Sequence, residues 1–185
     1  MRLLTISGSL RAASHNTALL RAAAELAPEG IELELFEGLE RIPPYNEDWE
    51  GEAAGPEVER LRAEIAAADA VLFATPEYNG TIPGQLKQVV DWGSRPRGAE
   101  ASLWGKPVAV IGASIADYGA IWAQDSLRKA LGIAGARVLD AELAVGRADE
   151  RFGPNGELLD GETRVRLLEV LANLVDFSSE LAAAA

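Results

Sequence analysis

Two short stretches of nearly unbroken apolar sequence constrain the fold more than any other feature of this chain. Residues 69–75 read DAVLFAT, and residues 108–114 read VAVIGAS. A strand with one face in water alternates apolar and polar residues, whereas a continuous apolar run is typical of a strand covered on both faces. The two stretches therefore predict central strands of a parallel sheet that carries helices on both sides.

The rest of the chain alternates between strand and helix patterns. Residues 2–7 read as a short apolar strand, residues 31–36 alternate as a half-buried or edge strand does, and residues 136–140 form a weaker fifth strand. Helical spacing recurs between them and again over residues 162–181. We expect an α/β fold in which residues 1–185 form a single domain around a doubly wound, five-stranded parallel sheet. The terminal helix is expected to bury five apolar side chains: Val165, Leu168, Leu171, Ala172 and Val175.

Composition excludes several classes of function. The formal net charge of −12 argues against binding to nucleic acid or to an anionic membrane, since both need a basic surface. The chain has no cysteine and a single histidine, His15, so thiolate catalysis, a Ser-His-Asp triad and a metal site are not expected. No apolar run is long enough for a membrane span, and no signal peptide precedes the first strand. We therefore expect a cytoplasmic protein.

The turn between the first strand and the first helix carries chemistry suited to an anion. Residues 8–17 hold one glycine, one cation, several hydroxyls and an amide, and they open a helix whose N-terminus has free N–H groups and a positive dipole. The P-loop and dinucleotide fingerprints are both absent. The candidate phosphate contacts are Ser9, Arg11, Ser14, Asn16 and Thr17. The alternative is that Ser14 or Asn16 is only a helix N-cap and that Arg11 is a solvated surface charge.

Polar turns also follow the third and fourth strands. Ligands of open parallel sheets bind outside the carboxyl ends of the strands, so these turns are expected to meet the first one. The residues that we expect to contact a planar ring are Pro76, Glu77, Tyr78, Asn79 and Gly80, with Ser114 from the next strand. Alternatively, Tyr78 caps the core, Ser114 is an ordinary N-cap, and Glu77 forms a salt bridge or a structural hydrogen bond instead of acting as an acid.

Two further features have open interpretations. Residues 37–56, which are rich in proline, glycine and acids, form either a plain surface excursion or a substrate loop. Trp92, Trp104 and Trp122 either belong to the core, which we prefer for each, or lie at a subunit interface.

A phosphate at one end and a flat heteroaromatic ring at the other describe flavin mononucleotide (FMN). The chain also resembles the NADPH-dependent FMN reductase family, which is flavodoxin-like in fold and includes quinone, chromate and azo-dye reductases. The resemblance rests on GSLR and SHN in residues 8–16, on TPEYN at 75–79 with PG, LK and DW between 83 and 92, and on GKP and GAS between 105 and 114. The sequence departs from the family pattern after Ser114, where Asp117 and bulkier residues replace a glycine-rich continuation.

The resemblance implies the strand order 2-1-3-4-5 and FMN contacts from the residues named above. It also implies NAD(P)H as electron donor, small-molecule acceptors such as quinones, ping-pong two-electron transfer without an obligatory catalytic side chain, and a homodimer or homotetramer. One rival is a flavodoxin-type electron carrier that does not itself oxidise NAD(P)H. Another is a flavodoxin-like domain that has lost its cofactor.

Overall fold

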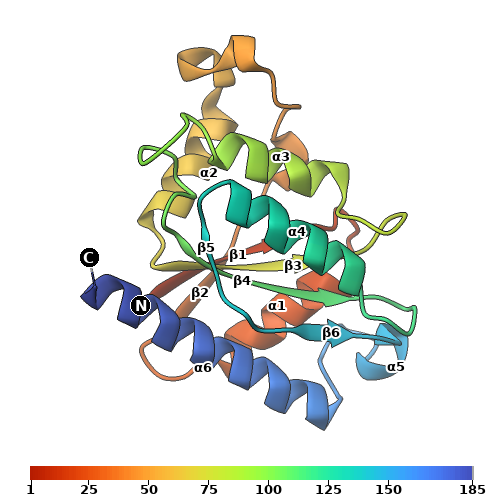
Figure 1. Ribbon diagram of the computed structural model, residues 1–185. Coiled ribbons are helices and arrows are strands. Elements are labelled where there is room, and N and C mark those ends of the chain that lie inside the picture. Colours follow the sequence, from red (N-terminus) through yellow and green to blue (C-terminus); the bar gives the residue numbers. More distant parts are fainter. Residues whose placement is uncertain (185) are drawn as a thin grey trace.

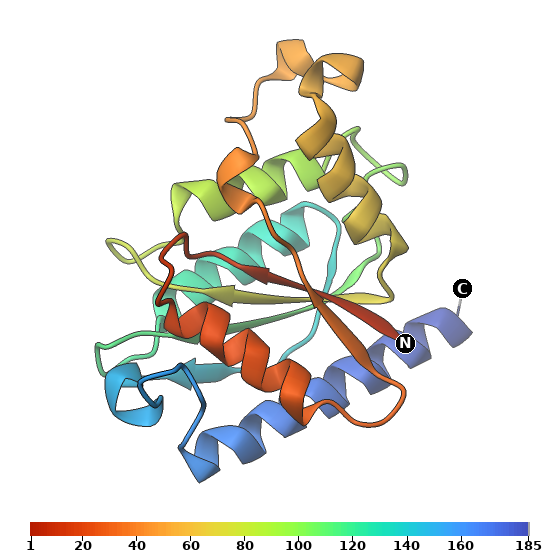
Figure 2. The ribbon, with the colours of Figure 1, turned by 180° about the vertical axis from the view of Figure 1, so that it is seen from behind.

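The computed structural model describes residues 1–184, apart from the side chains at 51 and 52, and places a parallel sheet between two layers of helices (Figures 1 and 2). The central strands are β1 (Arg2–Ser7), β3 (Ala70–Thr75) and β4 (Pro107–Ala113). β2 (Glu32–Leu35) lies at one edge, as its alternating sequence predicts, and the strand order is β2-β1-β3-β4-β5 with every pair parallel. The predicted order 2-1-3-4-5 is therefore confirmed.

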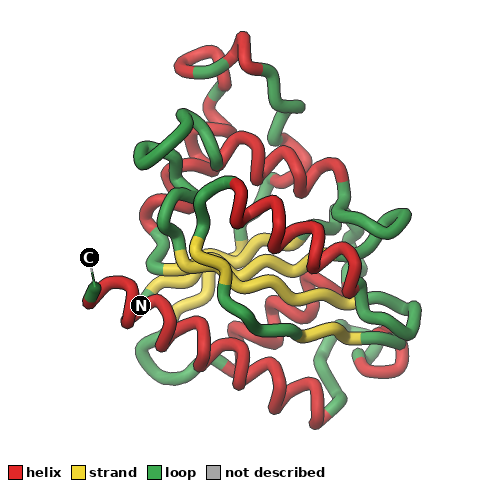
Figure 3. The backbone as a smooth tube through the Cα atoms, in the orientation of Figure 1, coloured by secondary structure: helices red, strands yellow, loops and turns green. Residues whose placement is uncertain are grey.

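The helices divide between the two faces of the sheet. On one face pack α2 (Pro56–Ala67), α3 (Gly84–Gly93) and α4 (Ile121–Ile133), and on the other pack α1 (His15–Leu26) and α6 (Gly161–Ala183). Figure 3 shows the strands enclosed between these two layers. Successive residues of β3 serve opposite faces, because Val71 and Phe73 pack under α2 and α3 while Leu72 and Ala74 pack under α1. This double burial explains the continuous apolar sequence.

The fifth position of the sheet is filled by two short strands instead of the single strand predicted at residues 136–140. β5 (Arg137–Val138) pairs with the start of β4, and β6 (Leu143–Val145) pairs with its end. Arg128 separates them, because its guanidinium donates to the carbonyl oxygens of Val110 at 3.2 Å and of Ala141 at 2.8 Å. A short helix, α5 (Ala148–Arg151), then follows β6.

The terminal helix turns a different face to the sheet from the one predicted. Leu171 is buried and Val175 half-buried as expected, but Val165 (56% exposed), Leu168 and Ala172 face outward. The buried face is the following set: Thr163, Leu167, Val170, Leu171, Leu174 and Ser178. Its two hydroxyls have protein partners, since Thr163 donates to Asp160 at 2.6 Å and Ser178 to the Asp69 carbonyl at 3.1 Å. Hydrogen bonds from the hydroxyl and the backbone N–H of Thr163 lower the pKa of Asp160, the N-cap of α6.

The excursion over residues 37–56 packs against α3. It contains the 3-10 turns η1 (Leu39–Arg41), η2 (Glu47–Trp49) and η3 (Gly51–Ala54). The fully buried Trp92 donates its indole N–H to the Pro43 carbonyl at 2.8 Å, and the Tyr45 ring meets Trp92 edge-on at 4.9 Å. The core assignment is thus confirmed for Trp92. It is wrong for Trp104 and Trp122, which are 54% and 51% exposed, because Trp104 lies in the turn before β4 and Trp122 lies on an exposed position of α4.

Candidate functional site

The turns after β1, β3 and β4 meet at one hollow, which we call the loop hollow. Its volume is about 210 Å³. The lining residues come from all three turns: Ser9, Arg11, Ser14, His15, Asn16, Pro76, Glu77, Tyr78, Ala113, Ser114 and Ile115. Figure 1 shows the turns after β3 and β4 on the same side of the molecule. Of the predicted site residues, Thr17, Asn79 and Gly80 lie outside this lining.

The first turn leaves β1 at a close approach between two strand ends. The Gly8 N–H donates to the Ala74 carbonyl at 2.7 Å, and a Cβ at Gly8 would lie 2.7 Å from the Leu86 side chain. A larger residue at this position would therefore require the Leu86 side chain to shift. This contact fixes the first turn against the end of β3.

Ser14 is the N-cap of α1, as one of the two interpretations predicted. Its Oγ accepts a hydrogen bond from the Thr17 N–H at 3.2 Å, and the Thr17 hydroxyl lies 2.8 Å from the Ser7 hydroxyl. The first turn of α1 contains no acidic residue, so no side chain there offsets the positive end of the helix. The N-terminus of α1 thus faces the loop hollow with its dipole uncompensated.

Asn16 joins the first turn to the third. Its side chain is buried, and its amide donates to the Ala113 carbonyl at 2.9 Å while accepting from the Ala113 N–H at 2.9 Å. Both polar atoms of the amide are therefore engaged by the last residue of β4. The Asn16 side chain therefore holds the first and third turns together. Only its backbone remains at the N-terminus of α1.

Arg11 supplies the cation of the loop hollow. Its side chain is exposed, and its N–H donates to the Ser9 Oγ at 3.3 Å. None of the ion pairs formed among the described residues involves Arg11. A guanidinium beside hydroxyls and helix N–H groups is a donor set suited to a phosphate, because charge-assisted hydrogen bonds contribute about 1.5–3 kcal/mol each.

The second turn is a tight two-residue hairpin. Tyr78 and Thr81 exchange backbone hydrogen bonds at 3.0 and 3.3 Å, and the turn residues Asn79 and Gly80 have φ values of 54° and 76°. Positive φ at both central positions is the condition that Asn-Gly satisfies. The turn holds Tyr78 at the wall of the loop hollow, 48% exposed, so the alternative that this ring caps the core is wrong.

The Glu77 carboxylate serves the start of α4. Its Oε2 accepts a hydrogen bond from the Ala123 N–H at 3.1 Å, which confirms the structural hydrogen bond as its role in the fold. An acid at the N-terminus of a helix also interacts favourably with the helix dipole. The Glu77 side chain is thus committed, and the backbone of residues 76–78 and the Tyr78 side chain are left for a ligand.

The third turn is held by β6, which the sequence did not predict. The Ser114 N–H donates to the Val145 carbonyl at 3.0 Å, and the Ser114 Oγ accepts from the Ala116 N–H at 3.1 Å. Ser114 therefore closes a turn and is not the N-cap of α4, whose N-cap is Ala120. Asp117, which departs from the family pattern, pairs with Arg147 at 3.2 Å.

Sequence reasoning missed His15 as a lining residue. The His15 ring lies 5.5 Å from the ring of Phe152, tilted by 38°, and Phe152 follows α5. The only signal was its place between Ser14 and Asn16, because nothing in the sequence brings residue 152 to this turn.

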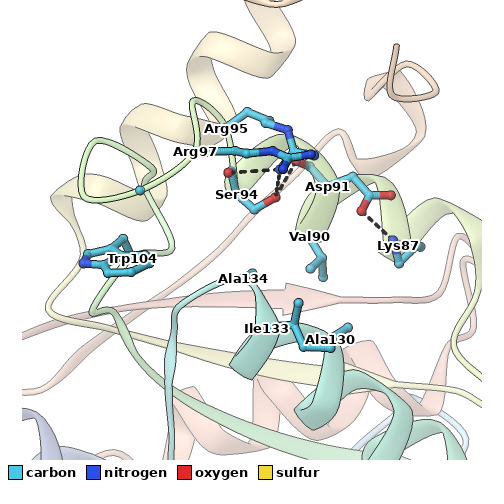
Figure 4. A pocket seen from close by; sticks show the side chains of 11 residues that line it. Lys87, Val90, Asp91, Ser94, Arg95, Arg97, Trp104, Ala130, Ile133 and Ala134 are labelled. Atoms are coloured by element: carbon cyan, nitrogen blue, oxygen red, sulfur yellow. Dashed lines mark hydrogen bonds and ion pairs between the residues drawn. The ribbon is translucent and has the colours of Figure 1, made fainter. Parts of the chain in front are cut away.

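A larger cavity lies elsewhere, between α3 and α4, with a volume of about 520 Å³ (Figure 4). Figure 4 shows Arg95 and Arg97 extending along its upper wall, while Val90, Ile133 and Trp104 line the other sides. The carboxyl ends of the strands do not reach it, and none of the predicted site residues lines it. The polar chemistry of the three turns therefore identifies the smaller loop hollow as the candidate site.

Replacing Asn16 tests the junction between the first and third turns. Asn16→Ala is expected to lower the free energy of unfolding by about 2–4 kcal/mol, because an unsatisfied buried group costs about 1–3 kcal/mol and Ala113 would lose partners for both its N–H and its carbonyl. Asn16→Asp, which keeps the acceptor but places a second carboxylate oxygen against the Ala113 carbonyl, is expected to lower the free energy of unfolding at least as much as Asn16→Ala. Urea unfolding followed by circular dichroism measures both. Asn173→Ala, on the exposed side of α6, is the control, and equal values for the two alanine variants would contradict the assignment.

The chain is similar in sequence to known proteins. Residues 1–150 match the family model of NADPH-dependent FMN reductases. The chain is 42% identical to an NAD(P)H-dependent FMN reductase of Pseudomonas aeruginosa over 94% of this chain and 93% of that protein. It is 41% identical to a quinone reductase of Pseudomonas putida over 84% of this chain and 83% of that protein.

Solved structures extend the agreement to three dimensions. The flavoenzyme NAD(P)H:(acceptor) oxidoreductase FerB of Paracoccus denitrificans superposes with a TM-score of 0.87 at 34% identity, over 97% of both chains. A flavodoxin of Pseudomonas aeruginosa, at 20% identity and a TM-score of 0.59, shares the fold, with 94% of this chain and 99% of that chain covered. The chain therefore belongs to the NADPH-dependent FMN reductase family.

Proposed function

We propose that this protein is an FMN-dependent NAD(P)H oxidoreductase that reduces quinones, flavins or similar acceptors by two electrons in a ping-pong cycle. The observation that carries the proposal is the convergence of a cation, hydroxyls and a helix N-terminus with an exposed tyrosine in one hollow. The quinone reductase and FMN reductase names of its relatives support the choice of substrates.

The residues around the loop hollow fit FMN at both ends. The phosphate would be held by the Arg11 guanidinium, by the hydroxyls of Ser9 and Thr17, and by the N–H groups that begin α1, with Ser14 and Asn16 shaping that turn. The ring would lie against the backbone of residues 76–78, the Tyr78 side chain and Ser114, while Asn79 and Gly80 hold the hairpin in place.

When bound, FMN supplies the redox chemistry, accepting a hydride from NAD(P)H and passing two electrons to the acceptor. The chain's own contribution is binding, orientation and electrostatics. Backbone N–H groups of the turns that do not already donate within the fold would stabilise negative charge on a bound ring at no cost of reorganisation. No side chain is proposed as a catalytic acid or base. Among residues 1–184 no helix is long and apolar enough to cross a membrane, and a cytoplasmic location remains a prediction.

The reaction with NADPH distinguishes an oxidoreductase from a flavodoxin-type electron carrier. The net charge of −12 is compatible with a carrier as well. The FMN-loaded protein, mixed anaerobically with NADPH, is expected to lose its flavin absorbance at once and to recover it when a quinone is added. Initial rates at varied NADPH and quinone should give parallel double-reciprocal lines. A flavin that stays oxidised would identify a carrier, and protein that fails to bind FMN would identify a domain without its cofactor.

Arg11 can be tested against the phosphate specifically. Arg11→Ala is expected to weaken FMN binding at least tenfold, because one charge-assisted hydrogen bond contributes about 1.5–3 kcal/mol. Riboflavin, which has no phosphate, should bind both proteins equally. Fluorescence titration of the apoprotein measures both ligands. Arg21→Ala, an exposed arginine farther along α1, is the matched control, and equal losses of affinity for FMN and riboflavin would remove Arg11 from the phosphate.

We also propose that the protein forms a homodimer or homotetramer through the outer side of α4. The large apolar side chains exposed there are Trp122, Ile133 and, just before the helix, Tyr118, whose ring lies 5.0 Å from Trp122. Trp104 and Ile133 also line the cavity between α3 and α4 (Figure 4). Exposed apolar side chains gathered on one side are typical of protein interfaces.

Sedimentation velocity tests the assembly. Wild-type protein is expected to sediment as a dimer or tetramer, and Trp122→Glu should shift it toward the monomer because the carboxylate would be buried without a partner. Trp49→Glu, at a tryptophan that is also exposed but lies on η2, should leave the mass unchanged. A monomeric wild type, or the same assembly in both variants, would contradict the proposal.

A further inference from the structure

A second hollow adjoins the loop hollow, and we call it the side hollow. Its volume is about 340 Å³, and it shares Arg11 and Tyr78 with the loop hollow. The rest of its wall includes Leu10, from the first turn, and Pro83 and Gly84, from the start of α3. Because the two hollows have two side chains in common, a molecule that occupies the side hollow lies next to whatever the loop hollow holds.

The wall of the side hollow is mainly apolar. Leu10 is 57% exposed although it is a large aliphatic residue, and Tyr78 presents its ring. Gln85 is the polar residue at the start of α3, but its Nε2 donates to the carbonyls of Leu39 at 2.6 Å and Ile42 at 2.7 Å. The Gln85 amide is therefore engaged with η1. The charged residue in the wall of the side hollow is Arg11.

Gly84 lines the side hollow and carries no side chain. It is the first residue of α3, and a Cβ built on it meets no atom within 4 Å. Its backbone is in ordinary helical territory, so the absence of a side chain here is not required by the turn. Any larger residue at this position would project into the free space.

We propose that the side hollow binds the apolar substituent of a quinone acceptor, such as an alkyl chain, while the quinone ring lies toward the loop hollow. The inference rests on the proposed function and narrows its substrate class to alkyl-substituted quinones. The overall reaction is NAD(P)H + H⁺ + quinone → NAD(P)⁺ + hydroquinone, in which the nicotinamide loses a hydride and the quinone gains two electrons and two protons. The side hollow takes no part in the chemistry and acts on acceptor binding.

Filling the side hollow tests the inference. Gly84→Leu places an aliphatic side chain in the free space without a backbone penalty. The matched control is Gly161→Leu, because Gly161 is also the first residue of a helix, α6, and also has no atom within 4 Å of a built Cβ. Two measurements are made on each protein. One is the ratio of kcat/KM for decylbenzoquinone to kcat/KM for unsubstituted benzoquinone, and the other is the calorimetric affinity for 4-hexylphenol, which undergoes no reaction.

In Gly84→Leu the kcat/KM ratio and the affinity for 4-hexylphenol are both expected to fall at least tenfold. A buried methylene contributes about a fourfold factor in affinity, so the loss of two suffices. The Gly161→Leu protein should match the wild type in both. The dissociation constant for FMN, measured separately by flavin fluorescence, should not change in either variant.

Three outcomes would overturn the inference. An unchanged ratio in Gly84→Leu would place the alkyl chain elsewhere. A weaker affinity for FMN in that variant would indicate that the flavin ring occupies the side hollow. A change in its sedimenting mass would indicate that a second copy of the chain occupies it. Failure of the wild type to bind FMN would instead overturn the proposed function, and the 4-hexylphenol titration would still decide whether the side hollow accepts an apolar group.

Discussion

The pair of hydrogen bonds between Asn16 and Ala113 is the contact on which the geometry of the site depends. It joins the start of α1 to the end of β4, two segments separated by 97 residues in the chain, and both bonds are buried. Gly8 makes the corresponding contact with the end of β3. Because buried polar groups are costly to leave unpaired, these bonds hold the three turns in one arrangement before any ligand binds. The donors around Arg11 are thus placed in advance.

The doubly wound sheet explains why polar chemistry gathers at a single edge. Parallel strands all end on the same side, and their central members are buried on both faces, so a ligand has access only at the turns. Against the net charge of −12, the local groups at this edge that favour an anion are one guanidinium and one uncompensated helix dipole. The loop hollow is smaller than the cavity between α3 and α4, so it is the polar chemistry of the three turns, and not volume, that identifies it as the candidate site.

Where prediction from the sequence went wrong, contacts between distant segments were responsible. α6 has two apolar series at helical spacing, and the sequence offers no reason to prefer the one that includes Thr163 and Ser178 until their partners Asp160 and Asp69 are in place. The fifth strand divides because Arg128, from α4, occupies the carbonyls that a continuous strand would use. The preferred core assignment is wrong for Trp104 and Trp122, which are exposed, and their alternative place at a subunit interface stays a proposal.

Local chemistry was sufficient for the central strands, the hairpin at Asn79-Gly80 and most of the residues that line the loop hollow, because each follows from apolar patterning, turn preferences or the place where a strand ends. The order of the strands was implied by the family resemblance. Tertiary structure alone decided what those residues do. It turned Asn16 and Glu77 toward backbone partners, placed the ring of His15 on Phe152, and put an apolar hollow beside Tyr78. The physical reason is that a side chain's role depends on which groups satisfy its hydrogen bonds, and here those groups lie on segments far away in the sequence.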